Sequence, residues 1–403
     1  MLTKLALRNI FRQKARTAMT LAAVVLGVAG LILAGGFVKD IFFQLGEAIV
    51  HSQTGHVQVF RDGFLDRGSR QPERFLMEDV TGVASRLEKH GGVAEVTARL
   101  NFSGLLNNGR RDLAIIGEGI DPDKEARLGS YINLLSGRQL RGDDAFGILL
   151  GQGVAASMDV GPGDSVTLVT NTAEGGLNTV DFEVVGIFQT FSKDFDARAV
   201  RIPLPAAQEL MFSTGANLLV VALERTEDTD RSLALIKASL PPDLEARGWR
   251  ELSDFYDKAV ELYDRQFGVL QFIILLMVLL SVANAVNMGV FERYGEFGTL
   301  QALGNTRAHV FRLVVLENML LGMIGAGLGV ILGLALAGAI SAVGIPMPPP
   351  PNSNQGYTAH IRPDLLTVVL AWIVGFVATV LAALLPARRV SRTPVVDALR
   401  QSI

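Results

Sequence analysis

The sequence predicts an α-helical membrane protein with four transmembrane helices and an α+β domain outside the membrane, and three observations lead to this fold class. Of 403 residues, 49% are hydrophobic and only 19% are charged. Four stretches lack Asp, Glu, Lys and Arg and are long enough to cross a hydrocarbon core of about 30 Å. The segment 39–265 between the first two has the composition of a soluble domain. The predicted spans are 17–38, 266–291, 318–343 and 365–387.

The first sixteen residues carry only basic charges. Lys4, Arg8 and Arg12 fall on one side of a helix and apolar residues fall on another, which predicts an amphipathic helix over 1–16 on the inner membrane surface. A disordered basic leader is the alternative. A cleavable signal peptide also starts with basic residues, but the apolar run 17–38 is too long for one and no clear A-x-A site follows.

The distribution of basic residues predicts the orientation, because Lys and Arg gather near the cytoplasmic ends of membrane helices. Residues 1–16 hold five of them and no acid, and the tail 388–403 holds four arginines and one Asp. The loop 344–364 holds one Arg and one Asp. Four crossings with both basic ends inside place both termini and 292–317 in the cytoplasm, and 39–265 outside it.

The outer segment repeats the order strand, helix, strand on either side of a long insertion. This arrangement predicts a split α+β part that is closed by its two halves. The first copy is 56–61, 79–90 and 93–106; the second is 218–224, 229–240 and a strand around Trp249.

The insertion, about 110–215, is predicted to be mostly β. Strand-like runs at 112–122, 146–170 and 182–188 are divided by glycine-rich turns. The segment 171–179 is predicted to form the tip of a hairpin.

Several classes of function are disfavoured by what the sequence lacks. It has no G-x-x-x-x-G-K-[ST] loop, no G-x-S-x-G elbow and no H-E-x-x-H motif. It has no cysteine, which excludes disulfides and thiolate metal sites. The four spans hold no ionisable residue, which argues against an ion-coupled carrier. We therefore expect no catalytic, cofactor or metal residue in this chain, and an energy source in another subunit.

The third span carries a ridge of small residues. Gly325, Gly329 and Gly333 form a double GxxxG pattern, which allows close helix packing. The ridge either contacts another span of the same subunit or forms a dimer face. Asn284 and Asn287 in the second span either bond to a neighbouring helix or line a polar cavity.

The stretch FERYGEFGTLQALGNTR (291–307) is short and charged, and it lies between two spans. It predicts a short helix that ends at Gly304–Asn305. Small residues at Gly298, Ala302 and Gly304 beside charged ones suit insertion into the groove of a partner. An ordinary cytoplasmic loop is the alternative.

The continuation ERYGEFGTLQALGNTRAHVFRLVVLENMLLGMIGAGLG resembles the ABC transporter permease domain of the FtsX/MacB type. That family has roughly E-R-x-x-E-I-G-x-x-x-A-L-G, then an acidic residue before a glycine-rich span; here Phe297 replaces the commonest Ile. The tail LLPARRVSRTPVVDALR and the N-terminal LALRNIFRQKARTAMTLAAVVLGVAG also resemble the family. GIDP (119–122), LLGQGVAASMDVGPGDSVTL and FEVVGIF resemble the periplasmic domain of lipoprotein-releasing (LolC/LolE-like) permeases.

The resemblance covers nearly the whole chain and implies a mechanism. The helix around Glu296–Leu303 would be a coupling helix that docks on a separate ATPase subunit, which binds ATP and Mg²⁺. Two permeases and two ATPases would form a complex in the bacterial inner membrane, and ATP-driven motion would reach the periplasmic domain. The residues expected to contact the ATPase are Glu292, Arg293, Glu296, Gly298, Thr299, Ala302, Leu303 and Gly304.

The resemblance implies release of lipoproteins, or of another lipophilic envelope substrate, as the function. An FtsX-like regulatory subunit that activates a cell-wall hydrolase is the alternative, and a scaffold without an ATPase would leave the coupling stretch unexplained. LolC-type subunits carry a longer, proline-containing hook where this chain has a short glycine-rich hairpin without proline. The hairpin residues expected to meet a periplasmic carrier or adaptor are Asn171, Glu174, Gly175, Gly176 and Asn178.

Overall fold

The computed structural model describes residues 14–68, 72–128, 132–172, 174–349 and 356–392. It has two compact units. The membrane unit comprises the described residues of Met1–Phe43, Ala259–Pro346 and Thr358–Ile403, and the soluble unit comprises those of Gln44–Lys258 and Met347–Tyr357. Most of the predicted amphipathic helix at 1–16 and most of the tail 388–403 lie outside the described residues.

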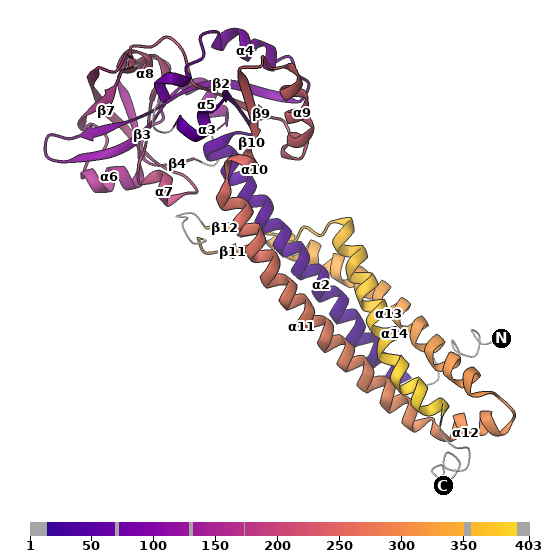
Figure 1. The fold of residues 1–403 in the computed structure, drawn as a ribbon. Helices are drawn as coiled ribbons and strands as arrows, with labels where there is room; N and C mark the ends of the chain where they lie inside the picture. The colour runs from indigo at the N-terminus through magenta and orange to yellow at the C-terminus, as the bar shows by residue number, and fades with distance from the viewer. Residues whose placement is uncertain (1–13, 69–71, 129–131, 173, 350–355, 393–403) are drawn as a thin grey trace. The chain divides into compact units, whose positions relative to one another are not determined.

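The membrane unit is a bundle of four long helices, each long and apolar enough to span a membrane, which confirms the predicted fold class. Figure 1 shows these helices side by side, with the short α12 at one end of the bundle. Three of these helices continue well beyond their predicted apolar spans, because helical hydrogen bonding does not depend on hydrophobicity. The helices are α2 (Lys14–Ile49), α11 (Asp254–Glu292), α12 (Tyr294–Ala302), α13 (Arg307–Val343) and α14 (Leu365–Ser391).

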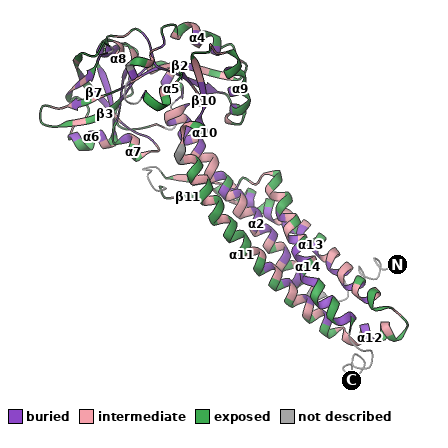
Figure 2. Ribbon diagram, in the orientation of Figure 1, coloured by how far each residue is buried: buried purple, intermediate pink, exposed green. Residues whose placement is uncertain are grey.

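Helix α2 is the central helix of the bundle. Half of its most apolar window is buried, against 17% for α11, and Figure 2 shows this difference. Glycines let the neighbouring backbones approach: a Cβ added at Gly27 would lie 2.2 Å from Val278 of α11, and one at Gly375 of α14 would lie 2.3 Å from Val28. The bundle is therefore packed around α2 by small residues, as is usual between membrane helices.

The soluble unit is built on a ten-stranded mixed sheet with the order β10-β1-β9-β2-β3-β8-β5-β7-β4, and β6 pairs with β2 and β7. The first four of these strands, with α4 and α9, form the predicted split part. Trp249 does not continue a strand: β10 ends at Gly248, and Trp249 begins the short helix α10 (Trp249–Leu252), in which it is buried. The elements are β1 (Val57–Arg61), α4 (Val80–Leu87), β2 (Val93–Asn107), β9 (Leu218–Leu223), α9 (Thr229–Ser239) and β10 (Leu244–Gly248).

The insertion supplies the remaining strands, but it is less purely β than expected. The predicted strand run 146–170 contains helix α6, whose Val154, Ala155 and Met158 are buried. A short apolar run does not distinguish strand from buried helix by periodicity. The elements are β3 (Asp112–Ile120), α5 (Pro122–Leu128), β4 (Asn133–Gly137), β5 (Gly147–Gly151), α6 (Gln152–Met158), β6 (Ser165–Asn171), β7 (Leu177–Gln189), α7 (Lys193–Asp196), β8 (Ala199–Pro203) and α8 (Leu204–Met211).

Short elements complete the described chain. The segment directly after α2 is a π-helical turn, η1 (Val50–Thr54). In the predicted loop 344–364, two short strands pair with each other, and residues 350–355 lie outside the described residues. The short elements are α3 (Phe64–Arg67), η2 (Pro72–Phe75), η3 (Thr226–Asp228), β11 (Ile345–Met347) and β12 (Tyr357–Ala359).

Candidate functional site

Arg293 fixes the start of α12. Its Nη1 donates to Glu317 Oε2 at 2.6 Å, and its Nε donates to Glu296 Oε2 at 3.1 Å. The guanidinium carbon lies 5.0 Å from the centre of the Phe297 ring, a favourable cation–π distance. Burial lowers the pKa of Arg293, but the bonds to Glu317 and Glu296 outweigh it and the net pKa is raised. Arg293 thus joins α12 to α13 as a permanent cation.

The other end of α12 closes with a Schellman motif. Gly304 has φ +94°, its N–H donates to Gln301 O at 3.0 Å, and the N–H of Asn305 donates to Leu300 O at 3.1 Å. These bonds satisfy two of the last helical carbonyls. The helix therefore ends at the glycine–asparagine pair that the sequence indicates.

The predicted ATPase-contact residues divide into two groups. Gly298 is buried and Arg293 is largely buried, so they hold α12 in place. Leu303 is 77% exposed and is the large apolar side chain at the tip of the helix. Their roles toward an ATPase stay predictions. The exposed members are Glu292, Thr299, Ala302, Leu303 and Gly304, and Glu296 is half-buried.

The glycine ridge of α13 faces α2 of the same chain. A Cβ at Gly329 would lie 2.7 Å from Val28 Cβ and 3.0 Å from the Val25 carbonyl oxygen. Cβ atoms at Gly325 and Gly333 would meet side chains of α2 at 3.0 and 3.1 Å. The ridge is occupied within the subunit.

The β6–β7 hairpin brings four of its five predicted residues to an exposed tip. Asn171, Glu174, Gly175 and Gly176 are exposed. Asn178 instead donates from Nδ2 to Leu210 O at 3.0 Å, at the end of α8. Residue 173 lies outside the described residues. Whether the tip binds a partner stays a prediction.

A cavity of about 640 Å³ in the membrane unit was not predicted. It lies at the end of the bundle from which α2 continues into the soluble unit, and α2, α11 and α14 form its walls. Its walls are mainly apolar, and Lys39, Asp264 and Gln271 contribute polar groups. The small residues Gly35 and Gly268 were the signal in the sequence. The lining residues are Leu31, Gly35, Val38, Lys39, Phe42, Val260, Asp264, Phe267, Gly268, Gln271, Phe272, Leu275, Thr367, Leu370, Ala371 and Val374.

The residues that lead into α14 are bound to α2 beside this cavity. Lys39 forms an ion pair with Asp364, whose side chain also accepts from Thr367 N at 2.9 Å and caps α14. The bond from Lys39 lowers the pKa of Asp364. Asp40 is fully buried and accepts from His360 N at 2.7 Å. These bonds fix one wall of the cavity.

The soluble unit contains a buried cluster of two arginines and two glutamates, which sequence reasoning also missed. Arg99 donates to both Glu125 oxygens at 2.6 and 2.9 Å, and Arg201 Nε donates to Glu118 Oε2 at 2.8 Å. Burial raises the pKa of Glu125, but the Arg99 charge outweighs it and the net pKa is lowered. Charged residues within otherwise apolar strands were the available signal.

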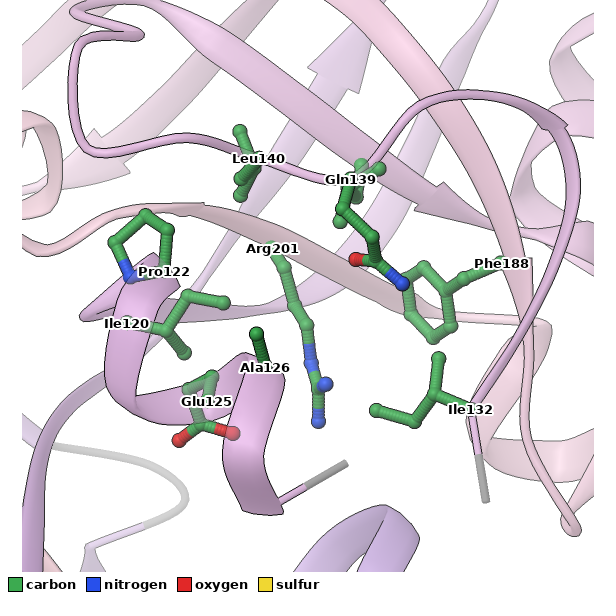
Figure 3. Close-up of a pocket in the computed structure, with 10 residues that line it drawn as sticks. Ile120, Pro122, Glu125, Ala126, Ile132, Gln139, Leu140, Phe188 and Arg201 are labelled. Atoms are coloured by element: carbon green, nitrogen blue, oxygen red, sulfur yellow. The ribbon is translucent and has the colours of Figure 1, made fainter. Parts of the chain in front are cut away.

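A cavity of about 100 Å³ adjoins this cluster. Figure 3 shows Arg201 in the middle of the lining residues, with Glu125 on one side of it and Gln139 and Phe188 on the other. The Arg201 guanidinium carbon lies 5.4 Å from the centre of the Phe188 ring. The two charged residues at this cavity are each already paired, Glu125 with Arg99 and Arg201 with Glu118, so it has the character of a structural core. Within the described part of the chain, no group of three or more His, Asp or Glu residues is arranged to hold a metal ion.

Comparison with known proteins identifies two family matches. The MacB-like periplasmic core domain matches residues 17–239, and the FtsX-like permease C-terminal family matches residues 268–395.

Individual relatives are distant. The lipoprotein-releasing system transmembrane protein LolC of Neisseria meningitidis is 23% identical over 95% of this chain and 94% of that protein. The lipoprotein-releasing system transmembrane protein LolE of Haemophilus influenzae is 22% identical over 62% of each chain. The crystal structure of the periplasmic region of MacB from Actinobacillus actinomycetemcomitans covers 52% of this chain and 95% of that chain, at 18% identity and a TM-score of 0.37.

Proposed function

Since this chain belongs to the ABC transporter permeases of the FtsX/MacB type, we propose that it releases lipoproteins, or another lipophilic envelope substrate, from the bacterial inner membrane. The family implies an ABC ATPase and a second permease as partners. In this proposal the ATPase binds ATP and Mg²⁺, and this chain contributes no catalytic residue. Both termini and α12 face the cytoplasm, and the soluble unit is periplasmic.

The ATPase would drive the complex through α12. Arg293 and Glu317 bind α12 to α13. A displacement of the exposed tip of α12 at Leu303 would therefore also displace the membrane helix α13. Both α2 and α11 run from the membrane unit into the soluble unit as continuous helices. A helix transmits displacement along its axis because every turn is hydrogen-bonded. This is the physical basis of the proposed mechanotransmission.

The cavity of about 640 Å³ is the observation that supports a lipophilic cargo. Its volume is within the range of ligand sites, and its mainly apolar walls suit acyl chains. Each methylene moved into water costs about 0.8 kcal/mol, so a lipidated protein that leaves the bilayer needs an apolar site on its route. With the proposed orientation, the cavity lies in the outer half of the membrane.

The second candidate is regulation of a periplasmic hydrolase without transport. The exposed tip of the β6–β7 hairpin favours a protein partner, and either a lipoprotein carrier or a hydrolase could be that partner. The cavity makes cargo handling the better-supported function.

The test fills the cavity. Gly268 lines it, and a Cβ added there meets nothing within 4 Å. We expect Gly268→Phe to reduce lipidated proteins that copurify with the tagged chain by about tenfold, with the ATPase retained. Gly338→Phe is the matched control, because Gly338 has equal space and lies outside the cavity.

The measurement is mass spectrometry after purification in mild detergent from native cells. If Gly268→Phe copurifies with as much lipoprotein as wild type, the cavity is not part of the path that lipoproteins take. Recovery of a cell-wall hydrolase in place of lipidated proteins would favour the regulatory function.

A further inference from the structure

The chain changes from membrane-helix extension to strand within a few residues. Helix α2 ends at Ile49, the π-helical turn η1 follows, and β1 begins at Val57. The N–H of Gly55 closes the turn on Val50 O at 2.9 Å, and the N–H of His56 already bonds to Val221 O in the sheet. Carbonyls at the end of a helix lack their usual donors, so those of the turn need partners from elsewhere.

Two buried arginines supply these partners. Arg99 Nη1 donates to Gln53 O at 2.5 Å, and Arg201 Nη2 donates to Ser52 O at 3.2 Å. A helix carries partial negative charge at its C-terminal end, so cations are favourable there. The two guanidinium groups therefore hold the end of the α2–η1 helix through its backbone.

The arginines are themselves held by glutamates. Arg99 is bound at two points by Glu125, and Arg201 is bound by Glu118. All four side chains are at most 8% exposed. Each arginine thus uses its planar set of donors for a carboxylate and a backbone carbonyl at once, which a lysine does not match.

The four residues come from both parts of the soluble unit. Arg99 lies on β2, which pairs with β9 of the split part, whereas Arg201 lies on β8 within the insertion. Glu118 lies on β3 and Glu125 on α5. The turn is therefore bound to the split part and the insertion simultaneously.

Stability alone does not account for this cluster. Burying four charges carries a large desolvation cost, and apolar residues of similar volume often give equal or greater stability. Buried ionic or polar groups fix a single geometry of their surroundings in some proteins. A π-helical turn is an irregular element, and such turns often occur at functional sites.

We propose that Arg99 and Arg201 are positioning residues that keep η1 rigid, so that a displacement of α2 reaches both parts of the soluble unit instead of being absorbed by the turn. The proposed function enters only as the source of that displacement. The rigidity of the turn can be measured without it.

Arg201→Lys distinguishes two roles of Arg201: holding the Ser52 carbonyl of η1, and neutralising the charge of Glu118. Lysine keeps a cation beside Glu118 but has no fork to hold the Ser52 carbonyl as well. If Arg201 served only to neutralise Glu118, Arg201→Lys would behave as wild type. The matched control is Arg138→Lys, because Arg138 also binds a carboxylate, Asp144, and a backbone carbonyl, that of Gln139, but these partners belong to the insertion and not to η1.

The measurement is hydrogen–deuterium exchange on the full chain in lipid nanodiscs, followed by mass spectrometry of peptides covering 44–57. We expect Arg201→Lys to accelerate exchange in these peptides about tenfold, with α9 peptides unchanged. Arg138→Lys should leave exchange in 44–57 as in wild type. Wild-type exchange of 44–57 in Arg201→Lys would overturn the proposal.

A second variant guards against misfolding. Arg201→Met with Glu118→Leu removes both charges and avoids an unpaired buried glutamate. We expect it to fold and to show the same faster exchange in 44–57; slow exchange there in the folded double variant would also overturn the proposal.

The two proposals fail separately. In the complex with the copurifying ATPase, Arg201→Lys should hydrolyse ATP at the wild-type rate but release less cargo. If Arg201→Lys exchanges faster in 44–57 but the wild type copurifies with no lipidated cargo, the proposed function is contradicted and the rigidity of η1 is still supported. If Arg201→Lys exchanges faster in 44–57 but releases lipidated cargo as fully as wild type, the role of η1 in transmission is contradicted.

Discussion

Arg293 is the side chain on which the position of α12 depends, because it binds residues of α12 and α13 at once. We expect Arg293→Ala to destabilise the chain by about 3 kcal/mol, since it removes the ion pair between Arg293 and the buried Glu317. Membrane insertion should persist, because no span loses hydrophobicity. Thermal unfolding in detergent, with ATPase copurification, measures both effects.

The control for this substitution is Arg312→Ala, which removes an exposed arginine from α13. It should cost less than about 0.5 kcal/mol. Equal unfolding temperatures for Arg293→Ala and wild type would contradict the role of Arg293.

His56 makes the stability of the soluble unit depend on pH. Its Nδ1 accepts from Leu223 N at 3.1 Å, and its Nε2 lies 3.0 Å from Thr226 Oγ1. Burial lowers the pKa of His56 to about 4; His51 adds to the shift and Glu47 opposes it. Between pH 6.5 and about 4, the unfolded chain takes up a proton that the folded chain does not. Acidification through this window therefore favours unfolding.

We expect His56 to remove about 2 kcal/mol of stability between pH 7.5 and pH 5. His56→Gln does not titrate, so its unfolding temperature should fall less than that of wild type over the same interval. His90→Gln, at a partly exposed site on the same unit, should follow wild type. Identical pH dependence in wild type and His56→Gln would show that His56 does not cause the effect.

At the scale of single elements, α13 depends on its glycine ridge for contact with α2. We expect Gly329→Leu to cost about 1–3 kcal/mol, because its side chain would overlap Val28 in a filled core. A Cβ added at Gly327, two residues away, meets nothing within 4 Å, so we expect Gly327→Leu to be close to neutral. Unfolding temperatures of the two variants in detergent provide the comparison. Equal values would mean that the ridge is not tightly packed.

Elements with a strong period were predictable, and elements that depend on tertiary contacts were not. The four spans follow from apolar length, and the stop after α12 follows from Gly304 and its Schellman bonds. Helix α6 was predicted as strand, because its apolar residues are too few to establish a period. It is helical because Val154, Ala155 and Met158 fill the core of the insertion on one face.

The candidate sites also divide into those that a local sequence pattern indicates and those that depend on tertiary contacts. The charged ends of α12 and its small residues mark it in the sequence. The cavity and the arginine cluster bring together residues far apart along the chain, such as Gly35 with Gly268 and Arg99 with Arg201. Local patterns do not encode such juxtapositions, so they required the structure.

At the scale of the whole molecule, we propose a transmission of motion from an ATPase to the soluble unit. In this proposal an ATPase would displace α12, Arg293 would pass the displacement to α13, and the packed glycines would pass it to α2. The continuous helices α2 and α11 would carry it into the soluble unit, where Arg99 and Arg201 hold the end of η1. A lipophilic cargo in the cavity beside α2 would be the object of this motion.

The measurement that tests this account most directly is the amount of ATPase that copurifies with the tagged chain when Leu303 is replaced by Asp. Leu303 is 77% exposed at the tip of α12, and Leu177→Asp is the control at a site 76% exposed in the soluble unit. We expect Leu303→Asp to lower the ATPase-to-permease ratio about tenfold, as loss of an apolar anchor does at an interface, and Leu177→Asp to leave it unchanged. The same ratio for wild type and Leu303→Asp, or no ATPase with the wild-type chain after crosslinking, would contradict the account.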